Sequence, residues 1–183
     1  ADKWRGTWAQ EGGAVLINQA IHFIDALTWI MGGVRSISGR YANLTHNGVI
    51  ETEDTAVASV IFNNGSLGTI EATSSSHITW EHTIFIHGDV GSLEMRNGKV
   101  MKVSFSDASL EEAVTADFAA CTTPEAGGVI KQYYGAGHPA QVADFVEAIR
   151  EGREPFVTGG SARHTVEIVL GIYASHMCGA WVS

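Results

Sequence analysis

Residues 11–33, EGGAVLINQAIHFIDALTWIMGG, form an apolar stretch that is interrupted by Asn18, His22 and Asp25 and that, after its first residue, lacks Lys, Arg and Glu. Positions three and four apart lie on the same side of an α-helix. Together with Trp29, the three polar residues therefore form one stripe, about 60° wide, on an otherwise apolar helix. The two glycines at the end of the stretch predict where the helix ends.

The stripe has three interpretations. It is a solvent-facing edge, or it holds a buried His22 hydrogen-bonded by Asp25, or it lines a pocket in which His22 acts as a general acid or base. Solvent edges usually recruit Lys, Glu or Gln, whereas Asn, His and Asp are poor helix formers. An ordinary imidazole titrates near neutrality, which suits proton transfer. In the pocket interpretation, Asn18 orients a substrate hydroxyl or the imidazole ring.

The rest of the chain predicts a series of strands followed by helices. Alternating apolar patterns predict strands in residues 34–46, 53–62, 66–75, 81–88, 91–96 and 99–105, with hairpin turns at NNG and NG. Helical spacing predicts helices in 137–155 and 160–178, and residues 109–114 suit a helical turn before a loop at 122–128. We expect one α+β domain, 1–183, with an open, mostly antiparallel mixed sheet and helices packed on one face.

The composition excludes several classes of partner. The chain has 183 residues, a net charge of −9 and no run of Lys or Arg, which argues against nucleic acid. Its longest apolar stretch is too interrupted to span a membrane. Two cysteines, Cys121 and Cys178, do not make a disulfide framework and predict reduced thiols in a cytoplasmic protein. Apolar residues on the outer sheet face predict a homo-oligomer.

Five segments, in order, resemble the C-terminal domain of the Gfo/Idh/MocA oxidoreductases, which include glucose-fructose oxidoreductase and inositol 2-dehydrogenase. The segments are WRGTW (4–8), GGAVLINQAIHFIDALTWIMG (12–32), IETEDTAVASVIFNNGSLGTIEATSS (50–75), IFIHGDVGSLEM (84–95) and GHPAQVADFVEAIREGREPFVTG (137–159). The resemblance implies a two-domain enzyme. An N-terminal Rossmann domain holds NAD or NADP and a catalytic Lys, while the C-terminal domain supplies the sheet, the substrate pocket and the oligomer contacts.

The resemblance also implies roles for single residues. His22 matches the catalytic His, which takes the hydroxyl proton as hydride leaves for the nicotinamide. Asn18 stands where many members have Asp, so a carboxylate is lost there, although Asn can still hydrogen-bond a sugar hydroxyl. Gly12 and Gly13 match two of the three family glycines, with Ala14 in the third place.

Three further residues are candidates for contacts with substrate. Trp8 and Arg5 precede the glycines and either close over the substrate or, in the case of Trp8, pack in the core. His138 follows Tyr133 and Tyr134 and either lines the pocket or simply begins a helix. Asp25 is expected to be a structural partner within the stripe.

The chain lacks the motifs that bind a dinucleotide. No GxGxxG follows a strand, and no Glu-Lys-Pro is present, so the Rossmann domain is absent from this chain and the chain alone is expected to be inactive. A metal site is not expected, because His77, His82 and His87 are five residues apart and alternate faces on a strand.

The leading hypothesis is the substrate-binding and oligomerisation domain of an NAD(P)-dependent dehydrogenase that acts on a sugar, polyol or related hydroxyl compound. Its partners are then the substrate and further copies of the chain, as a dimer or tetramer. One alternative is a cofactor-free binding or assembly module. Another is an NAD-dependent glycosidase of the same family.

Overall fold

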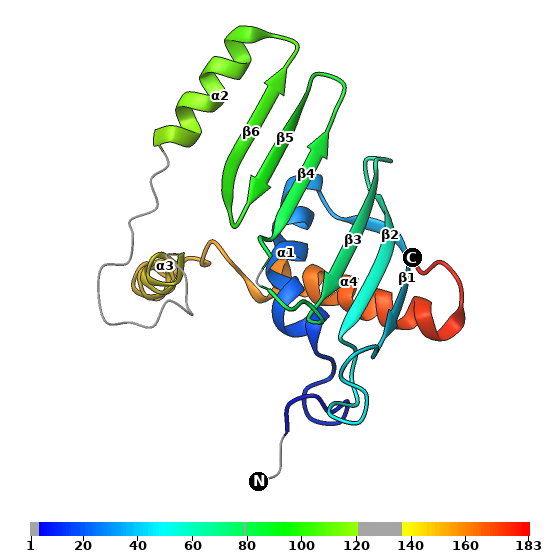
Figure 1. Cartoon of the computed structure of the whole chain (residues 1–183). Helices are drawn as coiled ribbons and strands as arrows, with labels where there is room; N and C mark the ends of the chain where they lie inside the picture. Colours follow the sequence, from blue (N-terminus) through cyan, green and yellow to red (C-terminus); the bar gives the residue numbers. More distant parts are fainter. Residues whose placement is uncertain (1–3, 79, 121–136) are drawn as a thin grey trace. The chain divides into compact units, whose positions relative to one another are not determined.

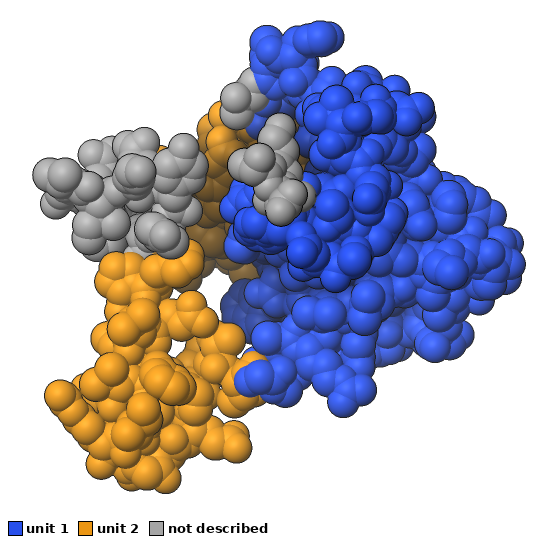
Figure 2. Space-filling model, turned by 90° about the horizontal axis from the view of Figure 1, so that it is seen from below, with its two compact units in different colours: residues 1–80, 159–183 blue, residues 81–158 orange. Residues whose placement is uncertain are grey.

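A computed structural model describes residues 4–78, 80–120 and 137–183 of the chain. The chain divides into two compact units, Ala1–Trp80 with Gly159–Ser183 and Glu81–Thr158, shown in blue and orange in Figure 2. Each unit contains one three-stranded antiparallel sheet and helices of its own. The α+β class predicted from the sequence is therefore confirmed.

The first unit has a sheet in the order β1-β2-β3 and helical segments packed on one of its faces (Figure 1). Its elements are the π-helix η1 (Val15–Ala20), α1 (Ile21–Met31), β1 (Val34–Ala42), β2 (Thr55–Phe62), β3 (Leu67–Thr73) and α4 (Gly159–Cys178). The predicted helix of the polar stripe is present, and its first turns are the wider π-helix. It ends at Gly32, whose φ of 81° suits glycine, and whose amide donates to Thr28 O.

The core of the first unit lies between β2 and the helices. Ala56, Ala58, Val60 and Phe62 alternate along β2 as buried residues, while Val57 and Ser59 between them are exposed. This period of two puts one face of the sheet against the helices and leaves the other outside. The inner face packs on a cluster from the helices that comprises Leu16, Ile24, Ile168, Val169, Ile172 and Tyr173.

Two glycines bring α4 close to β1. A Cβ atom on Gly39 of β1 would lie 2.9 Å from Ile172 Cγ2, and one on Gly171 of α4 would lie 2.9 Å from Ile37 Cγ2. The edge of β1 also pairs with Val182, whose backbone exchanges hydrogen bonds with Ile37. The residues that follow α4 are thus part of this unit.

The second unit has a sheet in the order β4-β5-β6 and two helices. Its elements are β4 (Thr83–His87), β5 (Gly91–Arg96), β6 (Lys99–Phe105), α2 (Ala108–Ala120) and α3 (Gly137–Glu151). The predicted NG hairpin joins β5 and β6, with φ of 48° at Asn97 and 75° at Gly98, as a type I′ turn requires. α2 packs along β6, and Glu111 accepts a 2.8 Å bond from the Phe105 amide.

Several features differ from the sequence prediction. The six strands form two three-stranded sheets and not one, because β3 and β4 do not pair with each other. β1 ends at Ala42 because the amides of Leu44–His46 turn to a buried carboxylate. The helical turn predicted in 109–114 extends to the whole of α2, and the loop predicted at 122–128 lies outside the described residues. Within the described ranges, no helix has the length and apolarity to cross a membrane.

Candidate functional site

The polar stripe of the first unit faces outward. Asn18 lies on η1 and is half-buried, while His22 and Asp25 on α1 are exposed, and Trp29 is 79% exposed. The interpretation with a buried histidine is therefore wrong, because the apolar part of the helix, which includes Ile24, takes the core side instead. His22 is left accessible one turn after Asn18.

Asp25 has a structural partner, but that partner lies on α4 and not, as the sequence predicted, within the stripe. Its Oδ1 accepts a hydrogen bond of 2.5 Å from the hydroxyl of Thr165, which is buried on α4. This bond fixes the rotation of α1 against α4, and so sets which side of α1 carries His22. The bond between Asp25 and Thr165 therefore positions α1, and it does not involve the His22 imidazole itself.

A buried carboxylate holds the start of the helix. Glu53 is fully buried and accepts hydrogen bonds of 3.0 Å from the amides of Ala14 and Leu16. It also accepts one of 2.9 Å from the hydroxyl of Tyr173 on α4. The carboxylate thereby satisfies two of the amides that a helix start leaves without partners, and its charge suits that end.

Tyr173 stays protonated in this setting. Burial first, and the neighbouring Glu53 charge second, hold the pKa of the Tyr173 phenol well above its ordinary value. Gly13 accounts for the close approach, because a Cβ there would overlap the Tyr173 hydroxyl. One of the glycines in the GG pair is thus required by packing around Glu53.

Asn18 itself has a carboxylate partner. Its Nδ2 donates a 3.1 Å bond to Glu11 Oε1, and the second oxygen of Glu11 accepts a bond from the Gly6 amide. Its Oδ1 accepts a 3.1 Å bond from Nε2 of Gln19. Neither Glu11 nor Glu53 was among the residues predicted from the sequence. In the sequence, Glu11 is marked only by the glycine pair that follows it, and Glu53 only by its place at the start of a predicted strand.

The N-terminal segment packs by its aromatic residues. Trp8 contacts Tyr41 and Tyr173 with ring centroids 5.5 Å and 5.4 Å away, and its Nε1 donates a 3.0 Å bond to Glu51 O. Trp8 is 37% exposed, so it packs on the core and still presents an edge outside. Arg5 is exposed, with its guanidinium 5.2 Å from the Trp4 ring centroid.

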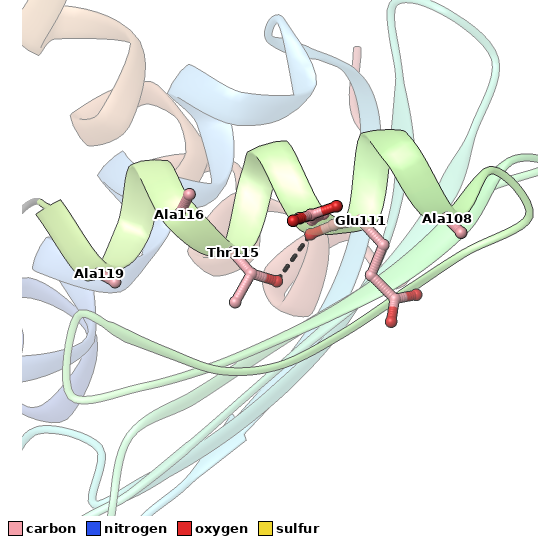
Figure 3. A pocket seen from close by; sticks show the side chains of 6 residues that line it. Ala108, Glu111, Thr115, Ala116 and Ala119 are labelled. Carbon is pink, nitrogen blue, oxygen red and sulfur yellow. Dashed lines mark hydrogen bonds between the residues drawn. The ribbon is translucent and has the colours of Figure 1, made fainter.

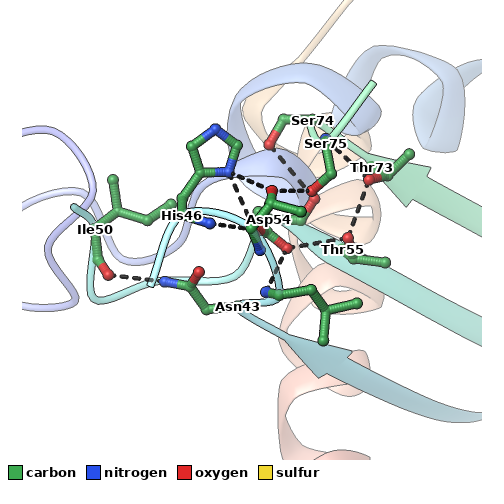
Figure 4. A network of polar contacts seen from close by, with 10 residues as sticks. Asn43, His46, Ile50, Asp54, Thr55, Thr73, Ser74 and Ser75 are labelled. Atoms are coloured by element: carbon green, nitrogen blue, oxygen red, sulfur yellow. Dashed lines mark hydrogen bonds and ion pairs between the residues drawn. The ribbon is translucent and has the colours of Figure 1, made fainter. Parts of the chain in front are cut away.

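The loop before β2 is organised by a second buried carboxylate (Figure 4). Asp54 accepts bonds of 3.0, 2.8 and 3.0 Å from the amides of Leu44, Thr45 and His46. Burial opposes its ionisation, but these amide bonds and the His46 imidazole at 3.1 Å outweigh it and hold the pKa of Asp54 well below its usual range. Asp54 is fully buried, and its bonds hold the backbone of residues 44–46 in place.

His138 belongs to the second unit, where it is an exposed residue in the first turn of α3. The neighbouring Tyr133 and Tyr134 lie outside the described residues. Asn18, His22, Trp8 and Arg5 thus belong to the first unit, and His138 belongs to the second.

Neither of two hollows on the surfaces of the described residues contains a predicted site residue. The hollow in Figure 3 lies along α2 and is lined by Ala108, Glu111, Glu112, Thr115, Ala116 and Ala119. The Thr115 hydroxyl donates a 2.7 Å hydrogen bond to the backbone oxygen of Glu111. The other lies on the outer face of β1, β2 and β3. The residues that the structure describes contain no cluster of three or more His, Cys, Asp or Glu arranged for a metal.

Comparison with known proteins gives a family match over the whole chain. The model of an oxidoreductase family, described as its C-terminal alpha/beta domain (GFO_IDH_MocA_C), matches residues 1–183. No curated protein matches the chain significantly.

Several solved structures share the fold. The WlbA dehydrogenase from Bordetella pertussis, in complex with NADH and UDP-GlcNAcA, is 26% identical with a TM-score of 0.82, over 99% of this chain and 50% of that one. The WlbA enzyme from Chromobacterium violaceum, with the same two ligands, is 28% identical with a TM-score of 0.77, over 100% and 49%. A levoglucosan dehydrogenase in complex with NADH and L-sorbose is 20% identical with a TM-score of 0.73, over 99% and 52%. The chain therefore spans about half the length of the structures it matches.

Proposed function

This chain belongs to the Gfo/Idh/MocA oxidoreductase family as its C-terminal alpha/beta domain, and we propose that it is the substrate-binding and oligomerisation domain of an NAD- or NADP-dependent dehydrogenase. The proposed substrate is a sugar, a polyol or a related hydroxyl compound. Support for this class comes from the solved relatives, which hold UDP-GlcNAcA or L-sorbose with NADH. Trp8, Arg5 and His138 are proposed substrate contacts.

The observation that carries the proposal is the exposure of His22 beside Asn18 on a helix that is rigidly held. Asp25 and Glu53 fix the helix to α4 and to the segment before β2, so the outward side is set by packing. His22 accepts the substrate hydroxyl proton as general base, while Asn18 hydrogen-bonds a substrate hydroxyl. The hydride acceptor is the nicotinamide, whose chemistry belongs to the cofactor.

The described residues do not themselves fit a dinucleotide. Both sheets are antiparallel, whereas dinucleotides bind at the switch point of parallel βαβ units. We therefore assign the binding of NAD or NADP to another part of the enzyme, and we expect the chain alone to be inactive. The cytoplasmic location predicted from the two cysteines is part of the same proposal.

The test is His22→Ala in the full-length enzyme. We expect turnover to fall by about 10²–10⁴-fold, as for loss of a general base, with melting unchanged because His22 is exposed. His164→Ala is the matched control, since His164 is an exposed histidine on α4 that pairs with Glu167. Near-normal turnover of the His22 variant would contradict the assigned role.

The outer face of β1, β2 and β3 is the proposed oligomer contact. Val57 is 50% exposed and Leu67 is 77% exposed on these strands. Burying them against a second copy removes apolar surface from water. Sedimentation of the purified protein would give a dimer or tetramer, and a monomer at all concentrations would rule this contact out.

Two alternatives remain distinct in their products. An NAD-dependent glycosidase would release a free sugar without net NADH, whereas a dehydrogenase yields a carbonyl compound with stoichiometric NADH. A cofactor-free module would bind its ligand equally well with and without NAD. Product analysis of the full-length protein separates all three.

A further inference from the structure

Glu11 links the N-terminal segment to the helix that carries Asn18. Its Oε1 accepts a 3.1 Å bond from Asn18 Nδ2, and its other oxygen accepts a bond from the Gly6 amide. Both side chains are half-buried, so the contact is partly protected from water. These two bonds hold the Glu11 carboxylate in one place against η1.

The contact fixes which way the Asn18 amide points. An ionised carboxylate only accepts hydrogen bonds, whereas the amide of Asn has a donor end and an acceptor end. The nitrogen of Asn18 must therefore face Glu11, and its carbonyl oxygen must face away. That oxygen accepts one bond, from Nε2 of exposed Gln19 at 3.1 Å, and has a second lone pair to offer.

We propose that Glu11 is a positioning residue that presents the Asn18 carbonyl oxygen, as a hydrogen-bond acceptor, to a hydroxyl of the substrate. This inference rests on the proposed function, in which Asn18 and His22 face the substrate. Glu11 acts through Asn18 and does not itself touch the substrate. Specificity then favours a substrate with a hydroxyl donor at that position.

Glu11 also explains why position 18 is Asn rather than Asp. An Asp side chain in the same place would put a second carboxylate oxygen where Asn18 Nδ2 now lies, 3.1 Å from Glu11. Two carboxylates in contact do not both ionise, so one would take up a proton. Asn keeps an acceptor at position 18 without placing a second carboxyl group beside Glu11.

The test compares Glu11→Gln, Asn18→Asp and the double variant with the full-length enzyme. Glu11→Gln can turn either end of its amide to Asn18, so we expect kcat/KM to fall about five- to tenfold. Asn18→Asp should lose more, because it creates the carboxylate pair. In the double variant the new amide at position 11 donates to the new carboxylate at position 18, and we expect most of that loss to be recovered.

The pH profile of the double variant tests whether the side chain at position 18 faces His22. In the double variant the carboxylate introduced at position 18 lies one turn before His22 and favours the protonated imidazole. The acid limb of kcat/KM should therefore move to higher pH by about half a pH unit. If the limb does not move, the side chain at position 18 does not face the imidazole, and the inference is overturned.

Glu167→Gln is the control, because Glu167 is an exposed carboxylate on α4 that pairs with Arg163 and lies outside the segment that holds Asn18. It should leave kcat/KM within about twofold of the original. Wild-type kcat/KM in Glu11→Gln, or equal activity of Asn18→Asp with and without Glu11→Gln, overturns the inference. If His22→Ala is inactive in that case, only the role of Glu11 fails; if His22→Ala is fully active, the proposed function fails.

Asn18→Asp keeps Glu11 and provides a second test should Glu11→Gln not fold. Carboxyl NMR of this variant should show one of the two carboxyls titrating at least about one pH unit above its ordinary range. Two ordinary titrations would mean that the side chains are not in contact, and would overturn the inference.

Discussion

Two helical segments of this protein begin beside a carboxylate, but the carboxylates come from different distances along the chain. α2 in the second unit follows Asp107, whose Oδ1 accepts bonds of 2.8 Å and 3.4 Å from the amides of Ser109 and Leu110. The π-helix that leads into α1 is held by Glu53, which bonds Leu16 across 37 positions of sequence. Both arrangements satisfy amides that a helix start leaves unpaired.

The difference shows how the two helices are tied to their surroundings. Asp107 stabilises α2 from within its own turn. Glu53 directly precedes Asp54 and β2, so the helix that carries His22 is tied to the sheet and, by Tyr173, to α4 as well. A helix tied in this way keeps its orientation only as long as the whole unit is folded.

Glu53→Ala should produce the largest loss of stability. It leaves the amides of Ala14 and Leu16 and the hydroxyl of Tyr173 without their buried acceptor. At about 1–3 kcal/mol for each unsatisfied group, partly relieved by water, we expect a loss of about 3–4 kcal/mol in the free energy of unfolding. Urea denaturation at neutral pH measures it.

Tyr173→Phe is the matched control for this prediction, because it removes a single donor and leaves Glu53 bound to both helix amides. Its loss should be a fraction of that in Glu53→Ala. Equal losses in the two variants would mean that the helix amides contribute little. The comparison between a distant and a local carboxylate would then have no energetic basis.

Most of the fold could be predicted from the sequence because strands and helices follow local patterns. The alternation in β2 and the turn at Asn97–Gly98 are examples, since period and turn chemistry depend on neighbouring residues. The end of β1 could not be predicted, because Leu44–His46 continue the strand-like composition and only the distant Asp54 turns their amides away. The division into two sheets is likewise a matter of long-range pairing.

Some residues of the candidate site could likewise be proposed from the sequence, and others could not. Asn18 and His22 could be proposed because they share a helical stripe and because His22 matches the family pattern, although Asn18 stands where many members have Asp. Glu53 and Glu11 could not, because a carboxylate before a strand or a loop looks the same whether it faces water or a helix amide. Glu53 binds Leu16 and Glu11 binds Asn18, both on η1, and only the folded chain brings these partners together.

Asp54→Asn extends the comparison of Glu53 with Asp107 to a third carboxylate. Asp54 is the immediate neighbour of Glu53 but binds a loop instead of a helix. Asn keeps one acceptor and loses the charge, and we expect about 2 kcal/mol less stability at neutral pH. The pKa of Asp54 is lower in the folded protein than in the unfolded chain, so its contribution is complete above about pH 4 and is lost as the pH falls.

The difference between Asp54→Asn and the original protein should therefore shrink in acid. Denaturation curves at about pH 7 and pH 3 measure this change. A difference that stays constant between these pH values would show that the charge of Asp54 is not what holds Leu44–His46.

Asp107→Ala should have the smallest effect, because Asp107 is an exposed residue that serves only the first turn of α2. We expect the amides of Ser109 and Leu110 to exchange hydrogen about three- to tenfold faster. Asp107→Asn keeps the acceptor and should restore most of the protection. If exchange instead rises throughout β4, β5 and β6, this local cap supports the whole second unit. The contrast with Glu53 would then lie in the length of chain between the partners and not in what the carboxylate stabilises.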